Sequence, residues 1–195
     1  MAPDLPDTPI ALAARDLARE VSSVALYNHC ERTYGFGVVV GEREGFEFDR
    51  ELLYVASILH DLGLTERFDG PEEFEVEGAT AAHAFLTERG WDHEKAELVR
   101  EAITFHTRPA NEDHDRKEVR LLTMGAGVDV LGLGIEDVPA DVVHAIVEEW
   151  PREGLKAELV ERFGDQARRK PESWVGMLVE NLDWLERIRA APFDD

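Results

Sequence analysis

Apolar residues recur at helical spacing through almost the whole chain, and this pattern limits the fold more than any other feature. From about residue 8 onward, apolar side chains return every three or four positions, as on one face of an α-helix. Strand signals are weak, because the β-branched stretch "FGVVVG" lies in a helical context. The 195 residues are enough for one domain with a sizeable core. We therefore expect an all-α protein with about eight helices and short loops.

Helix start and stop signals divide this pattern into segments. The first segment is expected to break near Ser22 and Ser23, Gly90 ends the third, and Pro139 suits the first turn of a later helix. Residues 1–8, rich in Pro and Asp, are expected to be frayed. The predicted helices cover 8–41, 49–62, 76–89, 93–105, 117–131, 139–150, 154–163 and 173–189. The polar stretch "TRPANEDHDRKE" is expected to start as a loop.

The charge balance of the chain excludes several classes of partner. It has 42 acidic and 21 basic residues, which gives a formal net charge of −21. Such a chain repels nucleic acid and anionic membranes, because Lys and Arg drive binding to phosphate. No apolar run approaches the ~20 residues of a membrane span, and the N-terminus lacks the features of a secretory signal. We expect a cytoplasmic protein with a small-molecule substrate, and a homo-oligomer is compatible with the sequence.

The stretch "VASILHDLGLT" places His60 and Asp61 side by side in an apolar segment. Both side chains are costly to bury without partners. A divalent metal ion accepts imidazole nitrogen and carboxylate oxygen together, whereas a simple His–Asp hydrogen bond is the alternative. A second dipeptide, His114–Asp115, lies in the charged stretch "NEDHDRK" and is expected at the solvated surface. The single Cys30 excludes an internal disulfide and a cysteine-rich zinc site.

Two further residues have surroundings like those of the His–Asp pair. His29 falls in "VALYNHCERTYGFG", and Asp129 falls in "LLTMGAGVDVLGLG" between two valines. The small residues of the second stretch, Gly125, Ala126 and Gly127, would allow neighbouring helices to approach closely. Four ligands from three helices would form a metal site with open positions for water or substrate.

These motifs together resemble the HD-domain superfamily of metal-dependent phosphohydrolases. The stretches "NHCERTYGFG", "ILHDLGLTERF", "FEVEGA", "AITFHT" and "GAGVDVLGLG" are similar to the branch that contains the cyanamide hydratases. The resemblance runs from about Val21 to Pro171. It implies a bundle of five core helices with additional C-terminal helices. Residues 1–195 would then form a single HD domain, with a metal-binding core over 21–135 and C-terminal helices over 139–190.

The resemblance also implies the ligands and the chemistry. His29, His60, Asp61 and Asp129 would hold one divalent ion; Zn²⁺ is expected first, and Mn²⁺, Fe²⁺, Co²⁺ and Ni²⁺ are compatible. A metal-activated water would attack a small molecule, as in the conversion of cyanamide to urea. A phosphohydrolase that acts on a nucleotide or another phosphate ester is the alternative. A non-catalytic metal- or nucleotide-binding module and a di-iron oxygenase are further alternatives.

Two histidines decide between one metal ion and two. His83 and His106 follow His60 at spacings that suit a second metal in binuclear HD enzymes. We favour a mononuclear site, in which His106 is a catalytic pocket residue that binds substrate or moves a proton. In that case His83 lies near the substrate or on the helix surface.

Several other residues are candidates for substrate contact. Glu77 is expected either at the pocket rim as a proton carrier or as a charge that stabilises the N-terminus of its helix, and the second role is the simpler one for Glu75. Phe68 and Phe74 flank a Gly–Pro turn and would form an apolar lid or cap the core. Lys170 would contact an anionic substrate or, more simply, stabilise the end of a helix.

Overall fold

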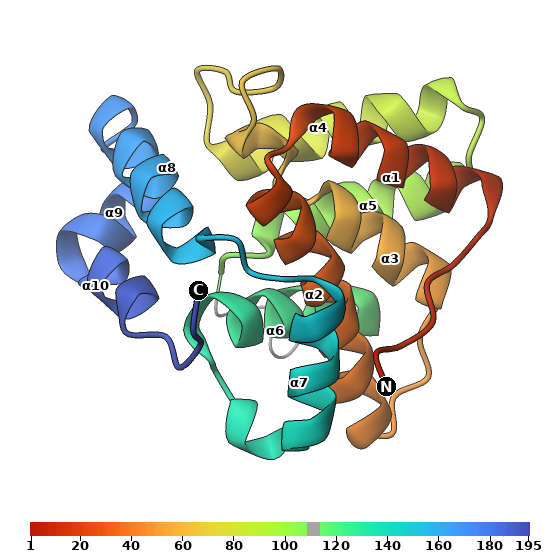
Figure 1. The fold of residues 1–195 in the computed structure, drawn as a ribbon. Coiled ribbons are helices and arrows are strands. Elements are labelled where there is room, and N and C mark those ends of the chain that lie inside the picture. The colour runs from red at the N-terminus through yellow and green to blue at the C-terminus, as the bar shows by residue number, and fades with distance from the viewer. Residues whose placement is uncertain (109–113) are drawn as a thin grey trace.

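The computed structural model describes residues 1–108 and 114–195, and over these ranges the chain forms helices and no strands (Figure 1). The all-α prediction is therefore confirmed. None of the described helices is both long enough and apolar enough to cross a bilayer. The helices are α1 (Pro9–Val21), α2 (Val24–Arg43), α3 (Arg50–Leu59), α4 (Phe74–Glu88), α5 (His93–Phe105), α6 (Lys117–Leu131), α7 (Ala140–Glu149), α8 (Leu155–Arg169), α9 (Trp174–Asn181) and α10 (Trp184–Arg189), with short 3-10 turns η1 (Leu62–Leu64) and η3 (Ile135–Asp137).

Most predicted boundaries agree with these helices, and the exceptions have local causes. The break near Ser22 and Ser23 is confirmed, because the Ser23 hydroxyl caps α2 and accepts a hydrogen bond from Leu26 N at 3.1 Å. The single helix predicted over 173–189 is wrong. Asp183 adopts a left-handed conformation, with φ of 49°, and separates α9 from α10. The helix predicted to end near Phe163 continues to the end of α8.

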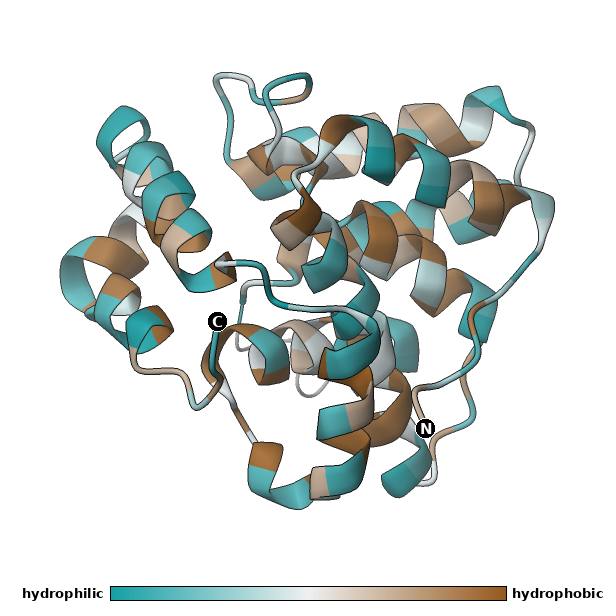
Figure 2. Ribbon diagram, in the orientation of Figure 1, coloured by the Kyte–Doolittle hydropathy of each residue, from teal (hydrophilic) through white to brown (hydrophobic). Residues whose placement is uncertain are grey.

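Helix α2 is the centre of the bundle, and most of its side chains are buried. It packs along α6 with glycines at the crossing. A Cβ atom on Gly125 would lie 2.2 Å from the Thr33 carbonyl oxygen, and one on Gly37 would lie 2.9 Å from the Leu121 carbonyl oxygen. These glycines therefore set the distance between the two helices, as the cluster of small residues predicted. Apolar faces of the surrounding helices turn toward this centre (Figure 2).

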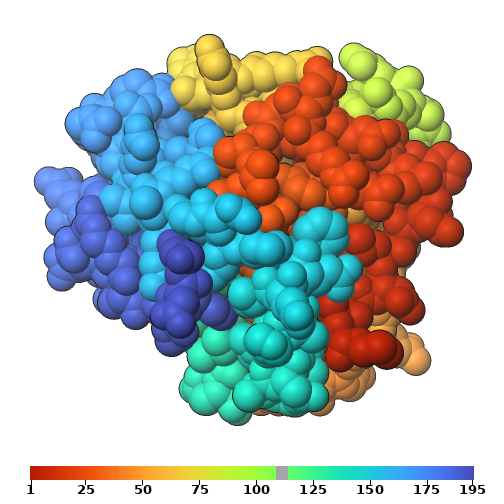
Figure 3. All heavy atoms as spheres, viewed as in Figure 1, coloured from red at the N-terminus to blue at the C-terminus, as the bar shows by residue number. Residues whose placement is uncertain are grey.

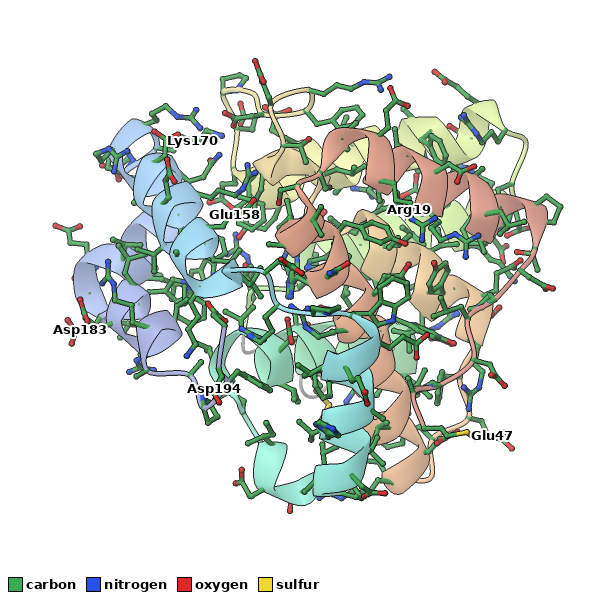
Figure 4. The ribbon with its side chains drawn as sticks, viewed as in Figure 1. Arg19, Glu47, Glu158, Lys170, Asp183 and Asp194 are labelled. Carbon is green, nitrogen blue, oxygen red and sulfur yellow. The ribbon has the colours of Figure 1, made fainter. Side chains whose placement is uncertain are left out.

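The C-terminal helices α8, α9 and α10 cover one side of the bundle (Figure 3). The Ser23 hydroxyl donates to Glu158 Oε1 at 2.6 Å, so α8 is tied to the start of α2. Arg162 Nη1 donates to the Leu64 carbonyl oxygen at 2.6 Å, which ties α8 to η1 as well. Glu158 is labelled in Figure 4 on the side of α8 that faces the bundle. This layer closes a second apolar cluster beside the first.

The N-terminal segment 1–8, expected to be frayed, lies against the helices. Ala2 and Leu5 pack on the core, and the Tyr34 hydroxyl donates to the Asp4 carbonyl oxygen at 3.1 Å. Thr8 caps α1 through a hydrogen bond from Ala11 N. These contacts give the segment a fixed course up to the first helix.

The α2–α6 crossing gives a test of the fold. Gly125→Ala should destabilise the protein by about 1–3 kcal/mol, because the new methyl group meets backbone atoms that cannot move aside. Gly127→Ala is the matched control on the same helix, because its Cβ would meet only the flexible Leu133 side chain, at 3.3 Å. Alanine is favoured over glycine in helices by roughly 1 kcal/mol, so the control should be neutral or stabilising. Urea unfolding measures both, and equal stability of the two variants would contradict this account of the crossing.

Candidate metal centre

His60 and Asp61 lie where α3 ends. His60 is the C-cap residue, and its Nδ1–H donates to the Ser57 carbonyl oxygen at 2.7 Å. Because a carbonyl can only accept, the proton is on Nδ1 and the lone pair of a neutral ring is on Nε2. The chain then turns through Asp61 into η1. A Cβ on Gly63 would lie 1.9 Å from the Phe74 carbonyl oxygen, so glycine is needed for α4 to start this close to the site.

His29 comes from the second turn of α2 and faces the same point. Its Nε2 lies 3.2 Å from His60 Nε2 and 3.5 Å from Asp61 Oδ2. His60 Nε2 is 3.3 Å from the same carboxylate oxygen. One ligand atom from each of these three buried residues lies within 4.8 Å of the other two. The structure thus brings together three of the four predicted ligands.

His106 repeats the geometry of His60 at the end of α5. It is also a C-cap residue, and its Nδ1–H donates to the Ile103 carbonyl oxygen at 2.6 Å. Its Nε2 lies 3.7 Å from Asp61 Oδ1. Burial lowers the pKa of His106 to about 4, so the ring is neutral at neutral pH. Phe74 is buried behind this ring, at 5.7 Å between ring centres, and so packs in the core.

The buried carboxylate of Asp61 has no lysine or arginine partner among the described residues. Its ion-pair neighbours are three histidines, His29, His60 and His106. Burial opposes ionisation of Asp61, but the nearby imidazoles outweigh it and hold its pKa below the usual range. Burial also opposes charge on His60, yet Asp61 and Cys30 raise the pKa of this histidine. A negative charge that faces several imidazole nitrogens fits a bound cation, and two imidazoles with a carboxylate suit a divalent metal of the zinc class.

Asp129, the fourth predicted ligand, lies on the other side of the His29 ring. Its Oδ2 accepts from His29 Nδ1 at 2.7 Å, so the carboxylate is turned away from Nε2. Arg32 donates to both oxygens, from Nε at 2.7 Å and from Nη2 at 2.9 Å. Arg152 Nη1 donates to Oδ1 at 3.0 Å. Burial opposes the charge on Asp129, but Arg32 and His29 outweigh it and lower its pKa.

Sequence reasoning missed both arginines of this group. Arg32 lies three residues after His29, so a helical spacing places the two on one face, and this signal was available in the sequence. Arg152 comes from the segment between α7 and α8, far along the chain, and had no comparable signal. Both side chains are almost fully buried.

A cavity of about 480 Å³ reaches the three converging residues. Its wall includes His106 and parts of α6, α8 and α9. A larger cavity, of about 780 Å³, lies along α1 and α4 and is lined by Phe68 and Glu77, but by none of the metal-site residues. The smaller cavity is therefore the candidate substrate pocket. Phe68 and Glu77, predicted near the substrate, lie at the other one.

Of the two acids in the first turn of α4, Glu75 and Glu77, the structure brings Glu75 near this pocket. Glu75 is buried, and its Oε1 accepts a hydrogen bond from the Thr107 hydroxyl at 2.6 Å. Thr107 itself lines the pocket. The other oxygen, Oε2, has no hydrogen-bond partner among the described residues. Burial raises the pKa of Glu75 to about 7.

Two other candidates lie outside the pocket. His83 Nε2 is 3.0 Å from Glu97 Oε1, and these residues form a separate group with His93 that has metal-ligand spacing. The structure does not bring His83 together with the three converging residues. Lys170, at the end of α8 (Figure 4), pairs with Asp69 Oδ1 at 3.0 Å. The Lys170 charge therefore serves a contact between α8 and the segment before α4.

The environment of Glu75 predicts a pH-dependent stability. Its pKa is raised from 4.5 to about 7, so the folded state binds the proton more tightly and stability falls as pH rises through this window. Glu75→Gln removes this cost and should stabilise the protein at pH 8 by up to about 3 kcal/mol, with little effect at pH 4.5. Glu77→Gln, two residues away, should show no such gain. Urea unfolding at both pH values measures the difference, and an equal effect of the two variants would refute the prediction.

Comparisons with known proteins identify the family of the chain. The family model described as HD domain matches residues 26–188, which include all four predicted ligands. Two relatives from Saccharomyces cerevisiae, cyanamide hydratase DDI2 and cyanamide hydratase DDI3, are each 24% identical over 152 residues. Each match covers 75% of this chain and 68% of the relative. Because the family model matches most of the sequence, the chain belongs to the HD-domain family, whose members are usually metal-dependent hydrolases.

Proposed function

We propose that the protein is a metal-dependent hydratase or hydrolase of a small molecule, with one divalent ion, Zn²⁺ first, held by His29, His60 and Asp61. The observation that carries this proposal is the convergence of imidazole Nε2 atoms on one buried carboxylate at the wall of a cavity. An ion that is closed off by protein would favour a structural role, whereas donors that line a cavity favour catalysis.

A divalent ion in this position would supply a Lewis acid, which lowers the pKa of bound water toward ~7. The side chains of the protein would move the proton and hold the ligands in place. His106 is neutral and its Nδ1 is taken by a backbone carbonyl, so Nε2 is the atom that would accept or deliver a proton beside Asp61. His29 and His60 are each held by a hydrogen bond at Nδ1, so their Nε2 lone pairs stay oriented toward the ion.

The names of the yeast relatives support addition of water to a nitrile carbon, as in cyanamide hydration. A phosphohydrolase is the second candidate, and three arginines that line the pocket favour it: Arg43, Arg108 and Arg187. The separation of His83 from the converging residues supports a mononuclear site over a di-iron oxygenase.

Removal of the His–Asp pair tests the proposed function. The double variant His60→Ala/Asp61→Ala should lose both bound metal and turnover, because it removes two of the three donors. The chain offers a matched control in the other His–Asp dipeptide. His114 pairs with Glu101 at 3.4 Å and Asp115 is exposed, so His114→Ala/Asp115→Ala should keep both properties. Elemental analysis of protein purified without chelator measures the metal.

Turnover is measured with cyanamide and with a panel of nucleotides in the same assay. Full activity in the His60→Ala/Asp61→Ala variant would contradict the proposed function. Hydrolysis of nucleotides without hydration of cyanamide would replace the first candidate by the second. The His83 group is a second place where metal could bind, so metal content is also measured in His83→Ala, which should still hold one ion.

The position of Asp129 predicts a graded effect on metal affinity. As placed, its carboxylate orients His29, and loss of such a partner typically weakens metal binding by about 10–100-fold. Asp129→Asn should therefore still bind stoichiometric zinc at saturation, whereas Asp61→Asn should not. Competition with a chelating dye measures both, and circular dichroism checks that each variant is folded. Equal loss of zinc in the two variants would instead make Asp129 a direct ligand.

A further inference from the structure

The pocket is much larger than the smallest substrate that the relatives suggest. One water molecule, with a single heavy atom, takes up about 30 Å³ in the liquid. A molecule of three heavy atoms therefore occupies on the order of 100 Å³. The pocket of about 480 Å³ lies instead in the range of roughly 300–1,000 Å³ that holds drug-sized ligands. A three-atom substrate would leave most of the wall without a contact.

Much of the pocket wall is apolar, and its lining residues come from several helices, among them α2, α6, α8, α9 and α10. The apolar lining includes Met124, Val130, Leu131, Phe163, Leu178 and Leu182. Two apolar lining residues are open to solvent, with 60% of Leu133 and 44% of Leu182 exposed. Exposed apolar side chains around a cavity are a feature of ligand sites, because they lose water when the ligand binds.

The charges on the lining are balanced. Arg43 Nη2 lies 3.0 Å from Asp137 Oδ2, and both residues line the pocket. Arg108 Nη2 lies 2.8 Å from Glu73 Oε2, and its guanidinium group stacks on Trp174. Two of the three arginines are thus already paired with acids, and the protein as a whole carries −21. A phosphate group would have to displace these acids to reach Arg43 or Arg108. The three arginines of the lining are also matched in number by three lining acids, Glu44, Asp61 and Asp137, so the lining favours an uncharged substrate.

We infer that the substrate is an uncharged molecule with an apolar body larger than cyanamide, which places a small nitrile-type group at the His29–His60–Asp61 cluster. The class is that of N-substituted cyanamides and nitriles with aryl or alkyl groups. Water adds across the C≡N bond: its oxygen bonds to carbon, the π electrons move to nitrogen, and nitrogen takes one of the water protons. Proton transfer from oxygen to nitrogen then gives the urea or amide, with no oxidant or reductant. The inference rests on the proposed function.

A substrate series tests this inference. Turnover is compared for cyanamide, N-phenylcyanamide, benzonitrile and a nucleoside monophosphate. We expect kcat/KM for N-phenylcyanamide to exceed that for cyanamide by about 10-fold or more, because the pocket wall contributes only with an apolar body. Equal or lower kcat/KM for the larger compounds, with cyanamide turned over, would overturn the inference alone. A preference for the nucleotide would also overturn it, and absence of turnover with every compound would overturn the proposed function.

Binding measured without turnover separates the proposed metal-dependent activity from the inferred preference for an apolar substrate. In the His60→Ala/Asp61→Ala variant, isothermal titration calorimetry should detect N-phenylcyanamide with a negative heat-capacity change, which is the marker of apolar burial. No binding, or binding without that change, would contradict an apolar pocket.

Leu182 and Met177, two partly exposed apolar residues, provide a matched pair of variants. Leu182→Trp narrows the pocket and should lower kcat/KM for N-phenylcyanamide by about 10-fold. Met177 is 40% exposed, similar to Leu182, but does not line the pocket. Met177→Trp should therefore leave that value unchanged. An equal effect of both variants would overturn the assignment of this wall.

Discussion

The carboxylate of Asp129 is the point where separate parts of the chain meet. It accepts hydrogen bonds from His29 and Arg32 of α2 and from Arg152, which precedes α8. Arg152 also pairs with Asp195 at 2.8 Å, so the C-terminus joins the same group. A buried charge that loses its partner costs roughly 3–5 kcal/mol, so these contacts must form together. The crossing of α2 and α6 and the position of the last helices depend on this group.

The same interaction fixes the protonation of the site. Because Asp129 takes the Nδ1 proton of His29, the lone pair of that ring lies on Nε2 and faces the cluster. His60 and His106 reach the same state in another way, since each donates Nδ1–H to a carbonyl three residues earlier. Carbonyls in the last turn of a helix lack intrahelical partners, so a C-cap histidine satisfies one and aims its other nitrogen outward. The orientations of these three imidazole rings around Asp61 are thus set by the backbone and carboxylate oxygens that accept from Nδ1.

Helical periodicity predicted the helices, and polar residues in apolar segments predicted the three converging donors, because both signals are local patterns in the sequence. The bundle itself was what the resemblance to the HD domain implied. Features that depend on long-range contacts were not predictable. The break at Asp183 has no glycine or proline to mark it, and Arg152 reaches Asp129 from a loop. Glu75 and Glu77 lie about 200° apart around their helix, so one faces the pocket side and the other does not. The sequence shows that spacing but not which of the two positions is buried.

The acidity of the chain and the chemistry of its interior are separate matters. The charge of −21 is carried mainly by solvated side chains, and the few buried acids have different partners. Asp129 is paired with two arginines, whereas the hydroxyl of Thr107 donates to Glu75. Asp61 differs from both, since its ion-pair neighbours are all histidines that are neutral when they act as ligands. That arrangement leaves one negative charge for a cation to balance. Most of the pocket wall is apolar, and two of its three arginines are paired with acids, so the ion and its carboxylate dominate the field that a substrate meets.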